Sequence, residues 1–483
     1  MRIYFALVLI LLLLSQKGFG FNIREYSYQE MKEYIKGSTS FSEFEKQADI
    51  DKILENKLGI NFVYIDLSEC LKYALRDNYE IKIKEALSKQ KNWNYRNSIV
   101  KILPNVHYDY SRQDLKGEFL VGGIVPVGVH EIATNLYLNV EWDWFKKGKY
   151  FFDLFQNKYL NKSAQAQKKF SVDETLLKTS IAYYNLLEAK LEIEAYRTNL
   201  FELKYYKDIA EARYKAGLDR KYDLKRAEAD LAAAERNYET GINSLRLKQA
   251  ELAAIMGIEV FYPVYPNEIT VNQREIINKD LSLDELYFMA EKSREDIKSM
   301  TAQIKADEIK KHSNYSDILP DFTLSYQEGY AGTRRTGLRE NSSLRFNATI
   351  SLGKNALAGT ITQIKADGEY LKSQKLRLEQ KKQEIKSAIL TAYLARENAF
   401  VGIEASEKEL AAAQESLKIA IESYKAGESS FTDVLDAQSV KTNAKLSVVK
   451  NTIDYNKSQI QLLFESGIIS YCAILADYSQ NNS

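Results

Sequence analysis

Apolar residues follow two different periods along the chain. Over residues 159–216 they recur every three or four positions, which is the spacing of one face of an α-helix. That face carries Leu177, Ile181, Tyr184, Leu187, Leu191 and Ala195. A continuous helix over this stretch extends about 87 Å at 1.5 Å per residue. The pattern therefore predicts a rod much longer than an average globular helix, and residues 361–426 predict a second rod.

Four shorter segments instead alternate apolar and polar residues, which is the period of a β-strand with two unlike faces. They lie at about residues 105–114, 134–144, 321–328 and 342–352. Each is about ten residues long, the length that a tilted strand needs to cross a bilayer. The same pattern also fits a soluble antiparallel sheet with one face on a core. Trp142 and Trp144, placed where an interfacial aromatic girdle lies, favour the membrane.

Four strands cannot close a barrel by themselves, and lipid does not tolerate an open sheet edge. If these strands span a membrane, the chain must therefore oligomerise, and three copies supply twelve strands. The fold class predicted from the pattern is mainly α with a small β part.

Proline is rare and marks the boundaries of the other helices. Because proline costs roughly 3 kcal/mol inside a helix, the proline-free stretches predict further helices at about 66–103, 222–256, 282–318 and 432–466. Each rod ends at a Tyr-Lys-Ala-Gly turn, where glycine can close a helix in the left-handed conformation. Pro263 and Pro266 mark a linker in the middle of the chain.

The chain contains a duplication. Ile102-Leu103-Pro104 returns 216 residues later as Ile318-Leu319-Pro320, and each copy leads into alternating residues. Tyr214-Lys215-Ala216-Gly217 returns 210 residues later as Tyr424-Lys425-Ala426-Gly427. Gly257-Ile258 returns at that same spacing as Gly467-Ile468. Such ordered matches predict two copies of one helix–strand–strand–helix unit. The predicted organisation is a first repeat at 64–258, a linker at 259–281, a second repeat at 282–468 and a tail at 469–483.

The N-terminus predicts export. Residues 1–20 have the order of a signal peptide: Arg2, an apolar run from Ile3 to Leu14, and Gly18-Phe19-Gly20 before the cleavage point. The run is shorter than the ~20 residues that a spanning helix needs. Residues 21–63 form a charged extension whose role the sequence leaves open.

Composition and motifs argue against an enzyme. The formal net charge of +1 gives no reason to expect a nucleic-acid partner. No phosphate-binding loop, nucleophile–base set or zinc spacing occurs, so we expect no cofactor and no metal site. Cys70 and Cys472 are expected to be free thiols, and a bridge between them is possible only if the ends of the chain meet.

The duplicated units, the Ile-Leu-Pro runs and the Tyr-Lys-Ala-Gly turns resemble the TolC-like outer-membrane channel family. The resemblance covers about residues 64–468, and its most specific part is the run from Gly427 to Gln438, which reads GESSFTDVLDAQ. It implies a homotrimer in the outer membrane of a diderm bacterium, with a 12-stranded barrel of transmembrane strands and a long α-helical barrel in the periplasm. The implied function is the passive exit duct of a tripartite efflux or type I secretion system, with outer-membrane lipid, a periplasmic adaptor protein and an inner-membrane transporter as partners.

The resemblance also assigns roles at the periplasmic tip. The docking turns fall on Tyr214, Gly217, Leu218, Gly427, Glu428 and Ser429. Asp433 and Asp436 fall on the acidic ring that narrows the channel, and Tyr424 and Asp223 on residues that tie the closed gate together. Ser429 stands where some members have a gate arginine. The sequence therefore does not decide how tightly the gate closes.

The residues alone allow two interpretations of the aspartate pair. Asp433 and Asp436 lie three positions apart, so a helix presents both on one face and a trimer gathers six carboxylates. They also fit ordinary acids in the first turn of a helix.

For the function of the whole chain, the alternative to a channel is a periplasmic helical adaptor or structural coiled-coil protein. Residues 116–133 and 328–341 are predicted to be loops, and the resemblance to the channel family implies that both face the outside. The exported substrate, the pump and the adaptor are not readable from this sequence.

Overall fold

The computed structural model describes residues 51–121, 125–143, 145–215, 217, 220–278, 281–316, 319–350, 354–426 and 428–476. The predicted signal peptide, most of the extension that follows it and the end of the tail lie outside these ranges. The chain divides into two compact units, the first of which ends at Ile60. Within the first unit, residues 51–58 are helical.

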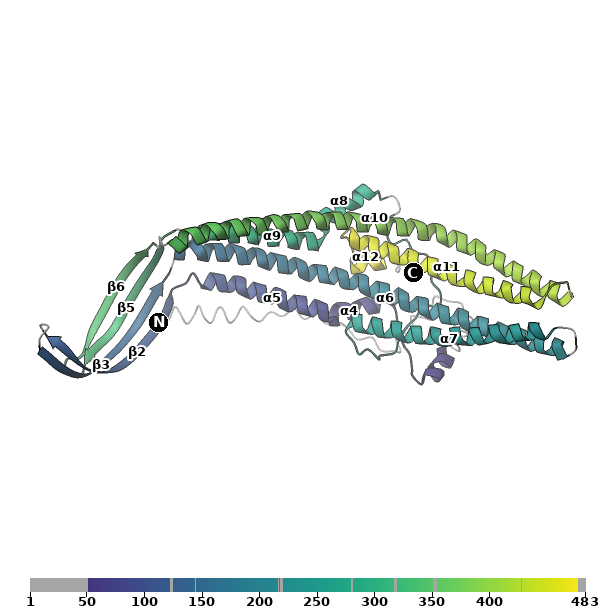
Figure 1. Ribbon diagram of the computed structural model, residues 1–483, viewed down its shortest axis with the longest axis horizontal. Helices are drawn as coiled ribbons and strands as arrows, with labels where there is room; N and C mark the ends of the chain where they lie inside the picture. Colours follow the sequence, from purple (N-terminus) through teal and green to yellow (C-terminus); the bar gives the residue numbers. More distant parts are fainter. Residues whose placement is uncertain are drawn as a thin grey trace. The chain divides into compact units, whose positions relative to one another are not determined.

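Both predicted rods are present in the second unit, and both are longer than predicted. Helix α6 runs over Lys149–Lys215 and α10 over Lys354–Ala426, with 67 and 73 residues. Helix α7 (Lys221–Met256) packs along α6, and α11 (Phe431–Glu465) packs along α10. Helix α11 also contacts α6, so it joins the two helical hairpins (Figure 1).

The two shorter helices predicted before the strands are each split in two, which corrects the sequence-based expectation. Helices α4 (Leu67–Asp77) and α5 (Tyr79–Val100) are separated by Asn78 alone. Helices α8 (Leu283–Ser293) and α9 (Glu295–Tyr315) are separated by Arg294 alone. Both residues leave the helical conformation, with ψ angles of 128° and 123°. Because each break takes up one residue and contains no proline, neither the periodicity nor the proline spacing revealed it.

The two breaks make equivalent contacts with the end of a long helix, α7 or α11, and we call each break with its contact a joint. Asn78 donates through Nδ2 to the carbonyl oxygen of Ile255 at 2.6 Å, and Arg294 donates through Nη1 to that of Glu465 at 3.0 Å. In each case the accepting residue stands two positions before a glycine with positive φ, Gly257 or Gly467. The joints therefore repeat the two sequence spacings: 216 residues between Asn78 and Arg294, and 210 between the two glycines.

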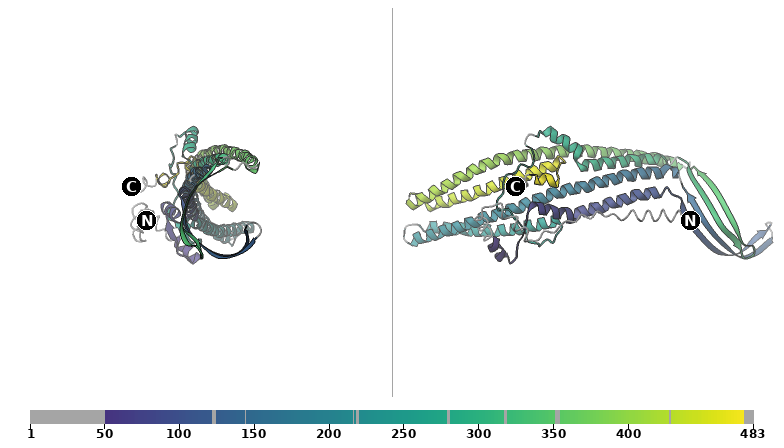
Figure 2. Two further views of the ribbon diagram at one scale, coloured as in Figure 1. Left: turned by 90° about the vertical axis from the view of Figure 1, so that its left-hand side faces the viewer. Right: turned by 180° about the vertical axis from the view of Figure 1, so that it is seen from behind.

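The four strands form one antiparallel sheet in the order β2-β3-β5-β6. Their bounds are Asn105–Val121, Val125–Trp142, Asp321–Thr333 and Gly337–Thr349. The sheet adjoins one end of α6 and α10 (Figure 1) and is curved when seen end-on (Figure 2). The short 3-10 helix η1 (Lys146–Gly148) connects β3 to α6.

The predicted loops at 116–133 and 328–341 are largely strand, which is a second correction. Pairing continues to Val121↔Val125 in the first hairpin and to Thr333↔Gly337 in the second, so residues 334–336 form the turn of the latter. Residues 122–124 lie outside the described ranges. Antiparallel pairing is made by the backbone, so it persists after the alternation of side chains has ended. The sequence located the strand ends next to the helices better than the ends at the hairpin turns.

The register gives the sheet one polar and one apolar face. Asn139 pairs with His107 and Gln327, and Val140 pairs with Val106 and Tyr326, so neighbouring positions face opposite ways. On the polar face, Asn139 donates to Asp109 at 2.6 Å, and Asn341 donates to the Tyr137 hydroxyl at 3.1 Å. On the other face Leu344 is 70 % and Phe346 61 % exposed. Within the described residues, no core of this chain covers the apolar face.

A small second sheet fixes the middle of the chain. Strand β1 (Val63–Ile65) pairs in parallel with β4 (Val264–Pro266). The buried ammonium of Lys190 on α6 donates to the carbonyl oxygens of Pro266 and Glu268 at 3.0 and 2.9 Å. The rings of Phe62 and Tyr265 stack with their centroids 4.2 Å apart. The end of the extension and the linker between the repeats are thus held against the first rod.

The ends of the second unit meet, yet the two cysteines are free. Ser68 on α4 and Tyr471 on α12 (Tyr471–Leu475) share a hydrogen bond of 2.8 Å between their hydroxyls. Cys70 is buried, which raises the pKa of its thiol, whereas Cys472 is exposed. In the described part of the chain, no helix is both long and apolar enough to cross a bilayer.

Candidate gate at the helical tip

Each helical hairpin ends in a tight turn at the end of the second unit that lies away from the sheet (Figure 1). After α6, Gly217 adopts a φ of +74° and its N–H donates to the carbonyl oxygen of Tyr214 at 3.0 Å. After α10, the N–H of Glu428 donates to the carbonyl oxygen of Ser423 at 2.9 Å. Leu218 and Gly427, two of the predicted docking residues, lie outside the described residues. Tyr214 and Glu428 are exposed, so they are accessible in the single chain.

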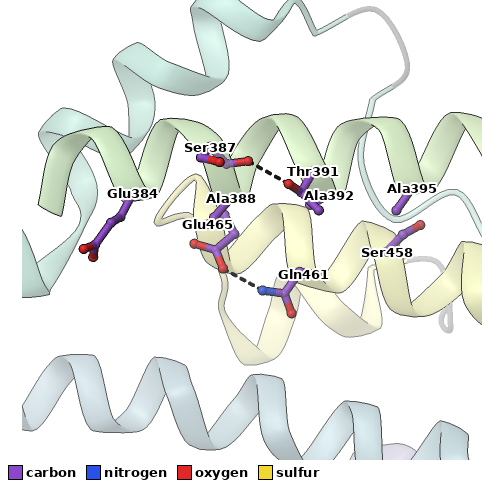
Figure 3. Close-up of a pocket in the computed structure, with 9 residues that line it drawn as sticks. All are labelled: Glu384, Ser387, Ala388, Thr391, Ala392, Ala395, Ser458, Gln461 and Glu465. Carbon is purple, nitrogen blue, oxygen red and sulfur yellow. Dashed lines mark hydrogen bonds between the residues drawn. The ribbon is translucent and has the colours of Figure 1, made fainter. Parts of the chain in front are cut away.

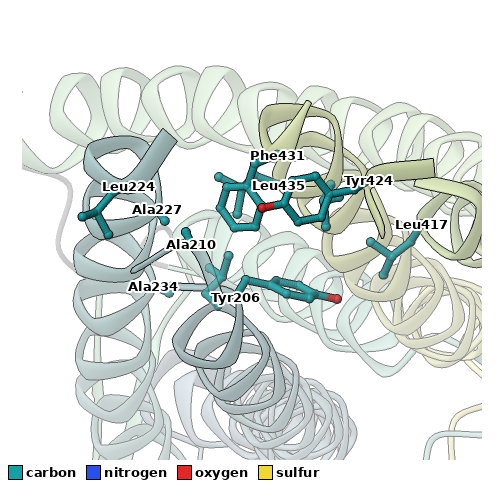
Figure 4. Packing of buried hydrophobic residues seen from close by; sticks show 11 residues of the cluster. Tyr206, Ala210, Leu224, Ala227, Ala234, Leu417, Tyr424, Phe431 and Leu435 are labelled. Carbon is teal, nitrogen blue, oxygen red and sulfur yellow. The ribbon is translucent and has the colours of Figure 1, made fainter. Parts of the chain in front are cut away.

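An apolar cluster joins all four helices next to these turns (Figure 4). We call it the tip cluster. Helix α6 contributes Leu203, Tyr206 and Ala210; α7 contributes Leu224, Ala227 and Ala234; α10 contributes Leu417 and Tyr424; and α11 contributes Phe431, Val434 and Leu435. Non-directional burial of this kind holds the two hairpins together without fixing one relative position of their helices.

The ring of Tyr424 belongs to this cluster. It is 7 % exposed, and its centroid lies 5.2 Å from that of Phe431. The guanidinium carbon of Arg213 lies 4.6 Å from the ring centroid, within the range of a cation–π contact. The sequence analysis expected Tyr424 to hold the closed gate through polar contacts and did not predict this packing. The aromatic residues on either side of the turn, Tyr424 and Phe431, were nevertheless visible in the sequence.

Asp223 and Asp433 take equivalent capping positions. The Asp223 carboxylate accepts from the backbone N–H of Arg220 at 3.3 Å and from its Nε at 3.2 Å. The Asp433 carboxylate accepts from the N–H and the hydroxyl of Ser430 at 2.9 and 3.0 Å. Each carboxylate satisfies a backbone donor at the start of its helix. Of the aspartate pair Asp433 and Asp436, the first-turn interpretation therefore describes part of what Asp433 does.

Asp436 has a different partner, on the other hairpin. Its Oδ1 lies 3.5 Å from Nη2 of Arg226 on α7, and the Asp436 side chain is 64 % exposed. Arg226 also donates through Nε to Asp230 on its own helix at 3.1 Å. One arginine thus bridges an acid of α7 and an acid of α11. Nothing in the sequence pointed to Arg226, because the two residues of the pair are 210 positions apart.

The described residues offer little for catalysis or metal binding. They contain no group of three or more His, Cys, Asp or Glu placed to hold a metal ion. An open groove between α10 and α11 is lined by Glu384, Ser387, Ala388, Thr391, Ala392, Ala395, Ser458, Gln461 and Glu465 (Figure 3). This set includes no histidine, cysteine or lysine. The small side chains and the openness of the groove fit the contact line of two long helices better than a substrate site.

Comparison with known proteins relates part of the chain to one family and its fold to several solved structures. Residues 286–467 match the outer membrane efflux protein family. The structure is similar to the CmeC outer-membrane channel of Campylobacter jejuni, with a TM-score of 0.75 and 16% identity over 86% of this chain and 89% of that one. It is also similar to the outer-membrane protein VceC of Vibrio cholerae, with a TM-score of 0.73 and 18% identity over 83% and 96%. The chain therefore has the fold of these outer-membrane channels, and part of its second half matches the outer membrane efflux protein family.

The open state of the MtrE channel of Neisseria gonorrhoeae is a further neighbour, with a TM-score of 0.69 and 16% identity over 83% of this chain and 89% of that one. No curated protein sequence matches the chain. At these identities the neighbours share the fold, and they assign no role to single residues of the tip.

Proposed function

We propose that this protein is a homotrimeric outer-membrane channel that serves as the passive exit duct of a tripartite efflux or type I secretion system. The observation that carries the proposal is the four-stranded sheet, whose apolar face is exposed and whose outer strands β2 and β6 are both edges. Such a sheet is stable in lipid only when its edges are paired. Three copies in a ring pair every edge and give twelve strands.

The helical tip is the proposed docking site for a periplasmic adaptor, through which an inner-membrane transporter supplies the energy of export. The turns at Tyr214, Gly217 and Leu218 and at Gly427, Glu428 and Ser429 are the residues that we assign to this contact. The described members of both turns lie where the helical hairpins end, and Tyr214 and Glu428 are exposed. The fold gives the adaptor alternative no support, because an adaptor does not need a sheet with an uncovered apolar face.

The proposed gate consists of Asp433 and Asp436, with Tyr424 and Asp223 supporting it. Asp433 and Asp436 lie one turn apart at the start of α11, and both are exposed. In a trimer their six carboxylates surround one axis, and such a ring attracts cations. Asp223 holds the start of α7 and Tyr424 anchors α10 in the tip cluster. In this proposal both act by positioning α7 and α10, against which α11 with its ring residues packs.

Single-channel conductance tests this proposal. Detergent-extracted protein is added to a planar lipid bilayer, and the current is recorded with and without divalent cations on each side. We expect trimers that resist heating in detergent, discrete current steps, and block by divalent cations from the side of the tip. A protein that stays soluble without detergent and gives no current steps contradicts the channel function.

A further inference from the structure

The two repeats share contacts between single side chains. In the first repeat, Asn157 on α6 donates to the hydroxyl of Ser98 on α5 at 2.8 Å. In the second repeat, Asn314 on α9 donates to the Asp367 carboxylate on α10. The two sequence spacings relate these residues, with 216 positions between Ser98 and Asn314 and 210 between Asn157 and Asp367. The spacings therefore identify residues of the two repeats that have equivalent surroundings.

The long helices of the second unit lie in a fixed order. The pair α5 and α7 packs on α6, α6 packs on the pair α9 and α11, and this second pair packs on α10. Seen end-on, the helices follow an open arc (Figure 2). One edge of the arc is α10, and the other edge is the pair α5 and α7. By the equivalence of the repeats, the free side of α10 corresponds to the side of α6 that α9 and α11 cover.

The contact of α6 with α9 is buried within the chain. Ser163 on α6 and Ser299 on α9 share a hydrogen bond of 2.9 Å between their hydroxyls, and both residues are buried. The Ser299 hydroxyl also donates to the carbonyl oxygen of Ser163 at 3.0 Å. One turn along α6, Ala166 is buried as well. The residue of α10 that is equivalent to Ser163 is Ser373, 210 positions later.

On α10 two equivalent positions are exposed and apolar. Leu376 stands 210 positions after Ala166 and is 63 % exposed, whereas Ala166 is buried. Val401 stands 210 positions after Leu191 and is 65 % exposed, whereas Leu191 is buried. Among the described residues, nothing covers this side of α10 as α9 and α11 cover the equivalent side of α6.

The other edge of the arc carries matching apolar residues. Ile83 on α5 is exposed and stands 216 positions before the buried Ser299. Leu247 on α7 is exposed and stands 210 positions before Lys457, whose ammonium binds Glu188 of α6 at 2.7 Å. Both are apolar residues whose equivalents are polar and contact α6 within the chain. Exposed apolar residues at such matched positions indicate a surface that another protein covers.

We propose that α10 of one copy packs on α5 and α7 of the next copy, in the register that α6 keeps with α9 and α11 within a chain. The inference rests on the proposed homotrimer and names the residues that join its copies. Ile83 then lies opposite Ser373 of the next copy, with Leu376 one turn away, and Leu247 lies next to Val401. A second copy is the occupant because these two edges are equivalent to two surfaces that already fit each other within the chain. Polar groups take part in the contact inside each chain, and apolar side chains meet between copies.

Cysteine pairs test this register. In a chain with Cys472→Ser, Ile83→Cys and Ser373→Cys place two thiols opposite each other across the proposed contact. We expect oxidation of the assembled protein to give covalently linked dimers and trimers on a non-reducing gel. The matched control carries Ile83→Cys with Lys375→Cys, because Nζ of Lys375 lies 2.8 Å from Glu308 on α9 of its own chain. We expect this control to remain monomeric on the gel.

Thiol labelling gives a second measurement that needs no bond between copies. Leu376→Cys, again with Cys472→Ser, should react with a maleimide about tenfold more slowly in the assembled protein than after denaturation in guanidinium, because buried thiols react poorly. Val440→Cys is the control. Val440 is exposed on α11, which lies between α6 and α10 of its own chain, so we expect similar rates in both states. The native Cys70 contributes the same background to both proteins.

The outcomes separate the register from the channel function. The register is overturned if Ser373→Cys gives no linked copies, if Lys375→Cys links equally well, or if Leu376→Cys reacts at one rate in both states. Current steps from the wild type then leave the channel function standing. A wild type that is monomeric in detergent and gives no current steps overturns the channel function itself.

Discussion

The guanidinium group of Arg294 donates a hydrogen bond of 3.0 Å to the carbonyl oxygen of Glu465 and so connects the break between α8 and α9 to the end of α11. The same group binds the Glu465 carboxylate at 2.7 Å and Asp296 at 2.8 Å. Its carbon also lies 5.2 Å from the ring centroid of Phe464. Arg294 is buried, and its charge is matched by two carboxylates. This joint leaves no room beside Gly467.

Gly467→Ala is expected to weaken the joint. Gly467 has a φ of +71°, and an added Cβ would lie 2.8 Å from Cγ and 2.9 Å from the backbone nitrogen of Arg294. The left-handed conformation alone costs a residue with a side chain about 1–2 kcal/mol. We therefore expect a lower unfolding temperature for the detergent-solubilised trimer, measured by circular dichroism.

Two further alanine substitutions separate the loss of stability at this joint from the effect of any glycine-to-alanine change. Gly257→Ala changes the equivalent glycine of the first repeat, where an added Cβ would lie 2.4 Å from the carbonyl oxygen of Asp77, so we expect a similar loss. Gly359→Ala changes an exposed position of α10 where no atom lies within 4 Å, and we expect no loss there. Equal unfolding temperatures for the Gly467→Ala and Gly359→Ala proteins contradict the role of the joint.

Lys190→Met is expected to loosen the linker between the repeats. Methionine fills a similar volume but cannot donate to the carbonyl oxygens of Pro266 and Glu268, which then lose a charged donor. A buried acceptor without a partner costs about 1–3 kcal/mol. We expect a lower unfolding temperature together with faster hydrogen exchange in residues 264–268. Lys178→Met, at an exposed position of the same helix, serves as the control. If hydrogen exchange in residues 264–268 is unchanged, Lys190 does not hold the linker against α6.

The sequence revealed the parts of this fold that depend on local pattern. The rods followed from periodicity repeated over many turns, and the strands from alternation around Tyr108, Leu138 and Leu344. Contacts of buried polar groups were not predictable in this way. Lys190 binds carbonyl oxygens 76 and 78 positions away, and Arg226 meets Asp436 across 210 positions. Such contacts depend on where the helices lie in space, which a single sequence without homologues does not give.

Asp173 is expected to make the stability of the protein depend on pH. Burial, followed by the charge of Glu295, raises the pKa of the Asp173 carboxyl from 3.8 to about 6, against the opposing effects of Arg294 and Lys298. The folded protein therefore binds the proton more tightly than the unfolded chain does. It follows that this carboxyl lowers the stability as pH rises from about 4 to about 6, and that the loss persists above 6.

Unfolding temperatures at two pH values test this expectation. Asp173→Asn removes the charge that is unfavourable at neutral pH, so the variant should gain stability over the wild type at pH 7.5 and little at pH 4. Asp208→Asn, at an exposed position of the same helix, is the control for replacing a carboxylate by an amide on α6. If Asp173→Asn gives the same shift at both pH values, Asp173 does not titrate in this range.

The acidic pair and its neighbour Arg226 should act on divalent block in opposite directions. Replacing Asp433 and Asp436 by asparagine removes six negative charges from a trimer, so we expect the divalent concentration for half block to rise. Arg226→Ala removes the cation 3.5 Å from Asp436, so we expect that concentration to fall. One charge at this range in a wet site is worth about 1 kcal/mol, or about fivefold. Both effects are measured as single-channel current against divalent concentration.

The choice of substitutions keeps the helix caps intact. Asparagine at position 433 still offers an oxygen to the N–H of Ser430, so the Asp433→Asn change tests charge and not the start of α11. Lys225→Ala removes a neighbouring cation of α7 whose partner, at 2.6 Å, is Glu228 of the same helix, and it should leave block unchanged. Unaltered block after both asparagine changes means that the aspartates serve only as first-turn acids. Block that responds to the asparagines but not to Arg226→Ala means that Arg226 does not tune the ring.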